Sequence, residues 1–486
     1  MRKKAKLYLL AGFASMSLTL VHCVGDDPAA VNATSGDDSG TDANQQTDTF
    51  VPPNDGGSPT DAGPDANICA GALGVTCGAG VDPCIIQITG GGQNFCARDN
   101  KCNVYCWGDN RDGQLAVPTT TLFSAKPLAV NFGGRLAAGV GIAGPAAVTA
   151  TGYTVACARV TANPEAPTSV VCWGGDEYGQ IAVAPDASTV MLNDAGRHYI
   201  PTPTDIPGIS AATLLGVGET HECAITSSNA LECWGDNTYG ELARDTGGVN
   251  TNPVPGLATF AGGGTPMPDA VTIGYQHMCT TNGAPGANDR VACVGEDSFD
   301  QLGRDGGPNS STLTAVLPIT NANFIAASKA STCAVNKSGA VVCWGDNSSG
   351  QTGIGSVSPT LVGYATPAVA PLAGGTPVVG LTAGTYHFCA ILNVPDPTDG
   401  GVAENVYCWG DNTLGEAVPG AATPVLIAAP VAGLPARAAQ IAAGSQATCA
   451  LMTDGTVYCW GQNYVGELGT GDPGDGGISG PVKVTF

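Results

Sequence analysis

Cysteine is the residue type with the clearest chemistry in this sequence, which has 19 cysteines among 486 residues. Fourteen of them fall into seven pairs, and the second cysteine of each pair is followed by Trp-Gly or, once, by Val-Gly. Paired cysteines in an exported chain are typical of disulfides rather than of metal sites. We therefore predict seven disulfides: Cys96–Cys106, Cys157–Cys172, Cys223–Cys233, Cys279–Cys293, Cys333–Cys343, Cys389–Cys408 and Cys449–Cys459.

Five cysteines remain outside these pairs, and one of them, Cys23, ends an apolar N-terminal segment. The other four, Cys69, Cys77, Cys84 and Cys102, can form two disulfides in three different pairings, between which the sequence does not choose. Zinc is the alternative for these four thiols. They lack the tight Cys-x-x-Cys spacing of most structural zinc sites, so disulfides are favoured.

Three histidines invite a metal hypothesis, because His221, His277 and His387 each stand two residues before a paired cysteine. A position that recurs once in each repeat is distributed over the fold and does not gather at one point. We expect these side chains to make structural hydrogen bonds between strands. His198 lies in an insertion and has no obvious partner in the sequence.

Turns rich in Asp and Asn follow each Cys-Trp-Gly, and they raise the question of calcium. The turn Asp346-Asn347-Ser348-Ser349-Gly350 lacks the alternating oxygen ligands and terminal Glu of an EF-hand loop. Asp and Asn also stabilise turns by bonding to their own backbone. We predict turn chemistry and no cofactor, with a surface calcium ion as the alternative in so acidic a chain.

No motif for catalysis is present: the sequence has no nucleophile elbow, phosphate loop, zincin helix or isolated carboxylate pair. We predict no catalytic residue and no resident metal. The alternative is an active site that several loops assemble, as in an extracellular hydrolase or lyase acting on polysaccharide.

The elements that position the cysteines are β-hairpins. In the fifth repeat, residues 331–335 and 340–345 flank the turn Asn336-Lys337-Ser338-Gly339, which suits a type I turn closed by a left-handed glycine. Counting outward from this turn sets Cys333 opposite Cys343 at a non-hydrogen-bonded pair, where side chains approach most closely. Four cysteine pairs have this spacing of ten residues. The other three have spacings of 14, 15 and 19, so their extra residues enlarge only the hairpin tip.

Each repeat contains about four strands and recurs every 50 to 66 residues, which is typical of one blade of a β-propeller. The sequence predicts an all-β, seven-bladed propeller of four-stranded blades, with the tryptophans packed between blades. The chain ends in a Pro/Val segment, Gly480–Phe486, and the first repeat begins at Cys84 without such a strand ahead of it. We expect this last strand to join the first blade and to close the ring.

The repeat phrase resembles the regulator of chromosome condensation repeat family. The resemblance rests on Gly-x-x-His-x-Cys-Ala-Leu followed by Val-Tyr-Cys-Trp-Gly-Asp-Asn-x-x-Gly-Glu-Leu-Gly, and it covers residues 84–486. It implies a seven-bladed propeller, and the paired cysteines resemble the exported, disulfide-rich bacterial branch. The founding eukaryotic member is a guanine-nucleotide exchange factor for a GTPase, but no motif of this chain maps onto that activity.

Composition divides the chain into four parts: a signal peptide (1–22), an acidic tether that we expect to be disordered (23–67), a cysteine-containing extension (68–83) and the propeller (84–486). The ending Leu20-Val21-His22-Cys23 resembles a bacterial lipobox, although His22 departs from its pattern. This resemblance implies lipidation at Cys23 and a place in the outer membrane or at the cell surface, with ordinary cleavage and secretion as the alternative.

The formal net charge of −23 repels phosphate backbones, so nucleic-acid binding is excluded. We expect a monomer that contacts the membrane only through its lipid and acts as a non-catalytic scaffold for an unknown protein or glycan at the cell surface. A GTPase regulator is a further alternative that follows from the resemblance. The partner is expected on the face that carries the enlarged hairpin tips. These candidate binding loops are Val160–Ser169, Thr280–Arg290 and Ile391–Asn405.

Overall fold

The computed structural model describes most of the chain from residue 74 to residue 486, and all described residues lie in one unit of the protein. Residues 1–73 lie outside the described part, and so do the predicted signal peptide, tether and lipidation site. The internal segments that the structure does not describe are 143–154, 164–165, 183–189, 262–267, 283–289, 305, 321, 337, 358–361, 368–371, 373–374, 396–403 and 475–479.

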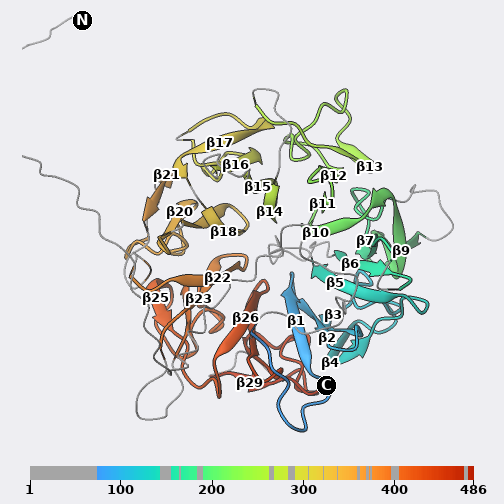
Figure 1. Cartoon of the computed structure of the whole chain (residues 1–486), viewed down its shortest axis with the longest axis vertical. Coiled ribbons are helices and arrows are strands. Elements are labelled where there is room, and N and C mark those ends of the chain that lie inside the picture. The colour runs from blue at the N-terminus through green and yellow to red at the C-terminus, as the bar shows by residue number, and fades with distance from the viewer. Residues whose placement is uncertain are drawn as a thin grey trace, which may run out of the picture. The chain divides into compact units, whose positions relative to one another are not determined.

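The described residues form seven antiparallel sheets arranged around a central axis, so the predicted all-β, seven-bladed propeller is confirmed (Figure 1). In each blade the first strand lies nearest the axis and the Pro/Val-rich strand lies at the periphery (Figure 1). The strands of the first three blades are β1 (Ile85–Gly90), β2 (Asn94–Asp99), β3 (Val104–Asp109) and β4 (Phe123–Ala129); β5 (Leu136–Ile142), β6 (Val155–Thr161), β7 (Ser169–Gly175), β8 (Met191–Leu192) and β9 (His198–Ser210); and β10 (Ala212–Val217), β11 (His221–Thr226), β12 (Leu231–Asp236) and β13 (Thr251–Leu257).

The remaining four blades repeat the same order of strands. They comprise β14 (Pro268–Ile273), β15 (His277–Asn282), β16 (Arg290–Gly295) and β17 (Ser310–Thr320); β18 (Ala322–Ala327), β19 (Ser331–Asn336), β20 (Val341–Gly345) and β21 (Val362–Pro367); β22 (Val378–Ala383), β23 (His387–Leu392), β24 (Val406–Gly410) and β25 (Val425–Pro430); and β26 (Ala438–Ala443), β27 (Ala447–Met452), β28 (Val457–Gly461) and β29 (Val482–Lys483).

The second blade departs from the four-stranded prediction, because its sheet has five strands in the order β5-β6-β7-β9-β8. The short strand β8 pairs with the start of β9 through Met191 and Tyr199. An insertion ahead of the outer strand thus folds back on that strand and extends the sheet by two residues.

The prediction that the last strand completes the first blade is wrong. Strand β29 pairs with β28 in the seventh blade, and the first blade has its own outer strand, β4. The reason is that each Pro/Val strand follows its Cys-Trp-Gly strand in the chain and can pair with it directly. Each blade is therefore one contiguous segment.

The ring closes through contacts between the first and seventh blades. The indole Nε1 of Trp107 donates to the carbonyl of Glu467 at 2.8 Å, and the amide of Ser445 donates to the carbonyl of Gly92 at 2.6 Å. The ring of Phe486 lies edge-on to that of Trp107, with 5.8 Å between centroids. Closure thus relies on packing and side contacts, and not on a shared strand.

An N-terminal extension reinforces this junction. The amides of Thr76 and Gly78 donate to the carbonyls of Thr453 and Asp454 at the tip of the β27–β28 hairpin, at 2.7 and 2.9 Å. A disulfide joins Cys77 in this extension to Cys84 at the start of the first blade. No helix in the described part of the chain is long and apolar enough to cross a bilayer.

Candidate functional site

The seven predicted cysteine pairs are bonded in the structure, each across the second and third strands of a blade. In the fifth blade Cys333 faces Cys343 in register, and their Cα atoms lie 4.1 Å apart. The other six pairs have Cα separations of 4.0 to 4.1 Å and the same cross-strand position. All fourteen side chains are buried, so they are structural parts of the blades.

The structure also chooses among the three pairings of the remaining four cysteines, since Cys77 bonds to Cys84. Cys102 is disulfide-bonded as well. Cys69 lies outside the described residues, so the pairing of Cys102 with Cys69 stays a prediction.

The tryptophans lie between the blades, as predicted, and each is fully buried. Each indole Nε1 donates to a backbone carbonyl in the Asp-Asn turn region of the preceding blade. The six donor–acceptor pairs are Trp107–Glu467, Trp173–Gln114, Trp234–Gln180, Trp344–Gln301, Trp409–Gln351 and Trp460–Ala417, at 2.7 to 3.2 Å. The fourth blade has Val294 instead, so the contact with the third blade lacks this hydrogen bond.

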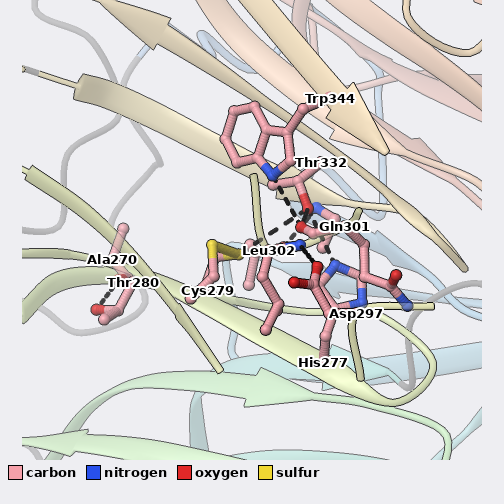
Figure 2. Close-up of a disulfide and its surroundings, with 12 residues drawn as sticks. Ala270, His277, Cys279, Thr280, Asp297, Gln301, Leu302, Thr332 and Trp344 are labelled. Carbon is pink, nitrogen blue, oxygen red and sulfur yellow. Dashed lines mark hydrogen bonds between the residues drawn. A yellow bond between two sulfur atoms is a disulfide. The ribbon is translucent and has the colours of Figure 1, made fainter. Parts of the chain in front are cut away.

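Two of the three histidines bond to the next blade, and they do not form a metal site. Figure 2 shows His277 beside Thr332, whose hydroxyl lies 3.0 Å from His277 Nε2 and donates to the carbonyl of Gln301 at 3.2 Å. His387 makes the same contact with Thr448 at 2.8 Å. Burial lowers the pKa of His277 to about 3 and that of His387 to about 4, so both are neutral at pH 7.

The third blade breaks this pairing on both of its sides. His221 is followed in the next blade by Met278 at the position of the threonine, and its Nε2 is buried without a hydrogen-bond partner. Glu222 is fully buried and neither carboxylate oxygen has a partner, because the preceding blade has Val155 at the histidine position. Burial, and then the charge of Asp176, raise the pKa of Glu222 well above its usual value.

The Asp-Asn turns are held by their own side chains. Asn110 illustrates this, because its amide donates to the carbonyl of Thr121 at 2.6 Å while its oxygen accepts from the amide of Leu115 at 2.9 Å. Asp346 likewise accepts from the amide of Ser348 at 2.9 Å. Among the residues that the structure describes, no three or more His, Cys, Asp or Glu side chains lie where they could hold one metal ion.

The candidate binding loops lie on the second, fourth and sixth blades, so they alternate around the ring. Their central parts fall in segments outside the described residues. The residues that bound them are mostly structural: Val160, Thr280, Ile391 and Asn405 are at most 3% exposed, Ser169 is half-buried, and Arg290 begins β16. The buried four thus mark the stems from which the loops start, and the role of the loops in binding stays a prediction.

These stems are fixed to the neighbouring blade. The hydroxyl of Thr168 donates to the carbonyl of Ala212 at 2.7 Å. Asn405 both donates to the carbonyl and accepts from the amide of Ala438, at 3.0 and 3.1 Å. Two of the loops therefore rise from rigid, well-bonded bases.

Sequence reasoning missed a second group of residues, on the opposite face. It lies in the turns that join the innermost strand of each blade to the second strand. Consecutive turns bond to one another around six blades, and we call this chain of contacts the collar. It runs from Thr220 to the carbonyl of Tyr275, then through backbone bonds to Lys329 and Thr385, and then through Ser445 to Gly92.

The collar places one lysine between two aromatic rings. Lys329 Nζ lies 5.9 Å from the ring centroid of Tyr275 and 5.5 Å from that of Tyr386, and it donates to Tyr386 Oη at 3.1 Å. Burial, and then the nearby carboxylate of Glu219, raise the pKa of Tyr275 to about 12. One feature of the sequence could have indicated these residues. The residue that follows the repeat glycine or serine changes from blade to blade, as in Tyr275 and Lys329.

Comparison with known proteins agrees with this geometry. The sequence description of the Regulator of chromosome condensation (RCC1) repeat matches residues 324–351 and 438–467. The chain contains RCC1 repeats. The crystal structure of human WBSCR16 superposes with a TM-score of 0.60 at 18% identity, over 79% of this chain and 95% of that one, which shows a common fold.

Other RCC1-repeat relatives match over shorter spans. The probable E3 ubiquitin-protein ligase HERC6 of Homo sapiens is 29% identical over 37% of this chain and 17% of its own length. The ultraviolet-B receptor UVR8 of Arabidopsis thaliana is 27% identical over 53% of this chain and 55% of its own. The chain thus spans about half, or less, of the length of these curated relatives.

Proposed function

We propose that this RCC1-repeat propeller is an exported, non-catalytic scaffold that binds a protein or glycan through the tips of its three long hairpins. The observation that supports the proposal is that the stems of the three hairpins lie on alternate blades, and that two of these stems bond to the neighbouring blade. Variable loops on a rigid scaffold are a common way to build a binding surface.

The cysteines support the exported location. Eight disulfides join described residues, and a protein with so many belongs to an oxidising compartment. The lipid anchor at Cys23, and with it the outer membrane or cell surface, is the part of the proposal that rests on the sequence alone. Mass spectrometry of the mature N-terminus tests it, because a diacylglyceryl group on Cys23 is expected and an unmodified N-terminus would contradict it.

The binding proposal is tested by replacing each long tip with the short turn of the fifth blade, Asn336–Gly339. Bound proteins and glycans are identified by crosslinking to intact cells and on a glycan array, for the native chain and for the shortened one. We expect the shortened chain to lose the partners and to keep its melting temperature, since the stems and disulfides are unchanged.

A matched control leaves the tips intact and changes an exposed residue of the outermost strand β29, for which Lys483→Gln suffices. If the shortened chain retains the same partners as the native chain, the tips do not form the binding surface. If it unfolds at a much lower temperature, the comparison is repeated with one tip shortened at a time, and the proposal fails when no single tip affects binding.

A further inference from the structure

Lys329 has an unusual environment for a cation in this protein. The chain has 41 acidic residues against 18 lysines and arginines, yet none of the ion pairs among the described residues includes Lys329. Its ammonium is held by the hydroxyl of Tyr386 and by the faces of two aromatic rings. Such contacts orient the charge without neutralising it.

The position of Lys329 is rigid. Its amide donates to the carbonyl of Thr385 in the next blade, and its carbonyl accepts from the amide of Tyr275 in the preceding one, at 3.3 and 3.4 Å. The side chain is half-buried, so its charge remains within reach of a ligand. A fixed and partly desolvated cation is a stronger binding group than a mobile surface lysine.

Aromatic side chains lie on the same face, in the turns between the third and fourth strands of neighbouring blades. Tyr178, Tyr239 and Phe299 occupy equivalent turn positions in the second, third and fourth blades. Phe299 is 43% exposed, and the two tyrosines are half-buried. Tyrosine and phenylalanine are enriched at protein-binding surfaces.

We propose that this face holds a second binding site, in which Lys329 takes the carboxylate of a glutamate or aspartate from a partner protein and the aromatic arc takes an adjacent apolar side chain. Charge complementarity argues for this occupant, since no carboxylate of the described residues forms an ion pair with Lys329. A polyanion such as nucleic acid is repelled by the net charge of −23, whereas a single carboxylate is not excluded from one local cation.

The test uses the whole chain and end-capped peptides of the sequences Gly-Phe-Glu-Phe-Gly, Gly-Phe-Gln-Phe-Gly and Gly-Phe-Lys-Phe-Gly. Binding is followed by saturation-transfer NMR in low salt, with peptide concentrations up to about 1 mM, where weak contacts remain measurable. We expect the Glu peptide to bind at least about tenfold more tightly than the Gln peptide, and the Lys peptide not to bind.

Variants then assign the site. Lys329→Gln is expected to weaken the Glu peptide to the level of the Gln peptide, and Lys329→Arg to retain most of the affinity because the charge remains. Lys483→Gln, which removes an exposed lysine from β29, serves as the matched control and should change nothing. Thermal melts establish that all three variants are folded.

The proposal is overturned if the Glu and Gln peptides bind equally, if neither binds, or if Lys329→Gln binds like the native chain. Its outcome is independent of the hairpin tips. The chain with shortened tips should bind the Glu peptide normally, so loss of the one site and loss of the other are distinguishable.

Discussion

One buried position of the repeat is glutamine in some blades and glutamate in others, and a buried glutamate carries an electrostatic cost that glutamine does not. In the fifth blade Gln351 accepts from the amide of Ser349 and donates to Asp346 at 2.9 Å. In the third blade Glu241 accepts from the amide of Tyr239 in the same way, but its other oxygen is buried without a partner. Burial, and then the charge of Asp236, raise the pKa of Glu241 to about 8, so at pH 7 it is mainly the neutral acid.

The change Glu241→Gln should therefore stabilise the protein in a pH-dependent way. Because the folded pKa of about 8 exceeds the ordinary value of 4.5, native Glu241 has no cost below pH 4.5, and its cost grows as the pH rises to about 8. We expect no gain at pH 4 and a gain of roughly 1–4 kcal/mol at pH 8. Urea unfolding across this range measures it. Glu404→Gln, at an exposed position, should give a flat profile, and equal gains at pH 4 and pH 8 would contradict the explanation.

The hydroxyl of Thr332 connects two blades, and its removal should destabilise the protein. Thr332→Val leaves Nε2 of the neutral His277 buried without a partner, which costs about 1–3 kcal/mol. Thr332→Ser keeps the hydroxyl and should cost less. Because the pKa of His277 is lowered to about 3, the loss should be the same at pH 5 and pH 8. Chemical unfolding at both values checks this, and a loss that differs between them would refute the assignment.

At the scale of the elements, the interfaces of the third blade differ from those that hold a histidine–threonine contact. Its interface with the second blade holds the unpaired carboxyl group of Glu222. Its interface with the fourth blade holds the unpaired Nε2 of His221 and lacks an indole because of Val294. Phe260 packs against the apolar cluster that contains Val294 and Leu313 in this second interface. The third blade thus lacks the histidine–threonine contact on both of its sides, whereas the fifth blade has it with the fourth.

Replacing the unpaired carboxyl should strengthen this blade. Glu222→Leu removes a buried acid whose pKa is raised well above 4.5, so the gain in stability should increase with pH and reach about 1–3 kcal/mol near neutrality. Hydrogen exchange of the β11 amides should slow in the variant. The β19 amides in the fifth blade provide the internal control, and an unchanged β11 would argue that Glu222 has a partner.

What the sequence could predict depends on whether a contact is local. The register of Cys333 with Cys343 follows from a short turn, and the number of blades follows from the repeat, so both were available in advance. The pairing of β29 was not, because a Pro/Val segment fits the edge of either neighbouring blade. The collar was hidden for a different reason: its contacts join residues about 55 positions apart, as in Thr220 and Tyr275, and much of it is backbone, which leaves no residue pattern.

At the scale of the whole molecule, the junction of the first and seventh blades has no shared strand and depends on the N-terminal extension. The Cys77–Cys84 disulfide fixes this extension, whose amides bond to the β27–β28 hairpin. The junction also holds an open pocket of about 340 Å³, lined on one side by the extension and on the other by the last residues of the chain. Both ends of the described propeller therefore meet at one place.

Removing this disulfide should loosen the junction selectively. In the double variant Cys77→Ser, Cys84→Ser we expect faster hydrogen exchange at Gly78 and Ile85, whose amides bond to the seventh blade, with little change in the fourth blade. A loss of roughly 2–3 kcal/mol is the upper range for so short a loop. Uniformly faster exchange in all blades would show that the junction is not an independent unit.

The covalent connection at Cys77 also determines how the propeller responds to mechanical force. A pull applied at residues 74–76 passes through the sulfur atoms directly to Cys84, because the disulfide bypasses the residues between Cys77 and Cys84. The load then enters β1, which antiparallel pairing with β2 holds along its whole length. A propeller pulled through this extension would therefore hold until β1 is sheared from β2. The outer strands would not separate first.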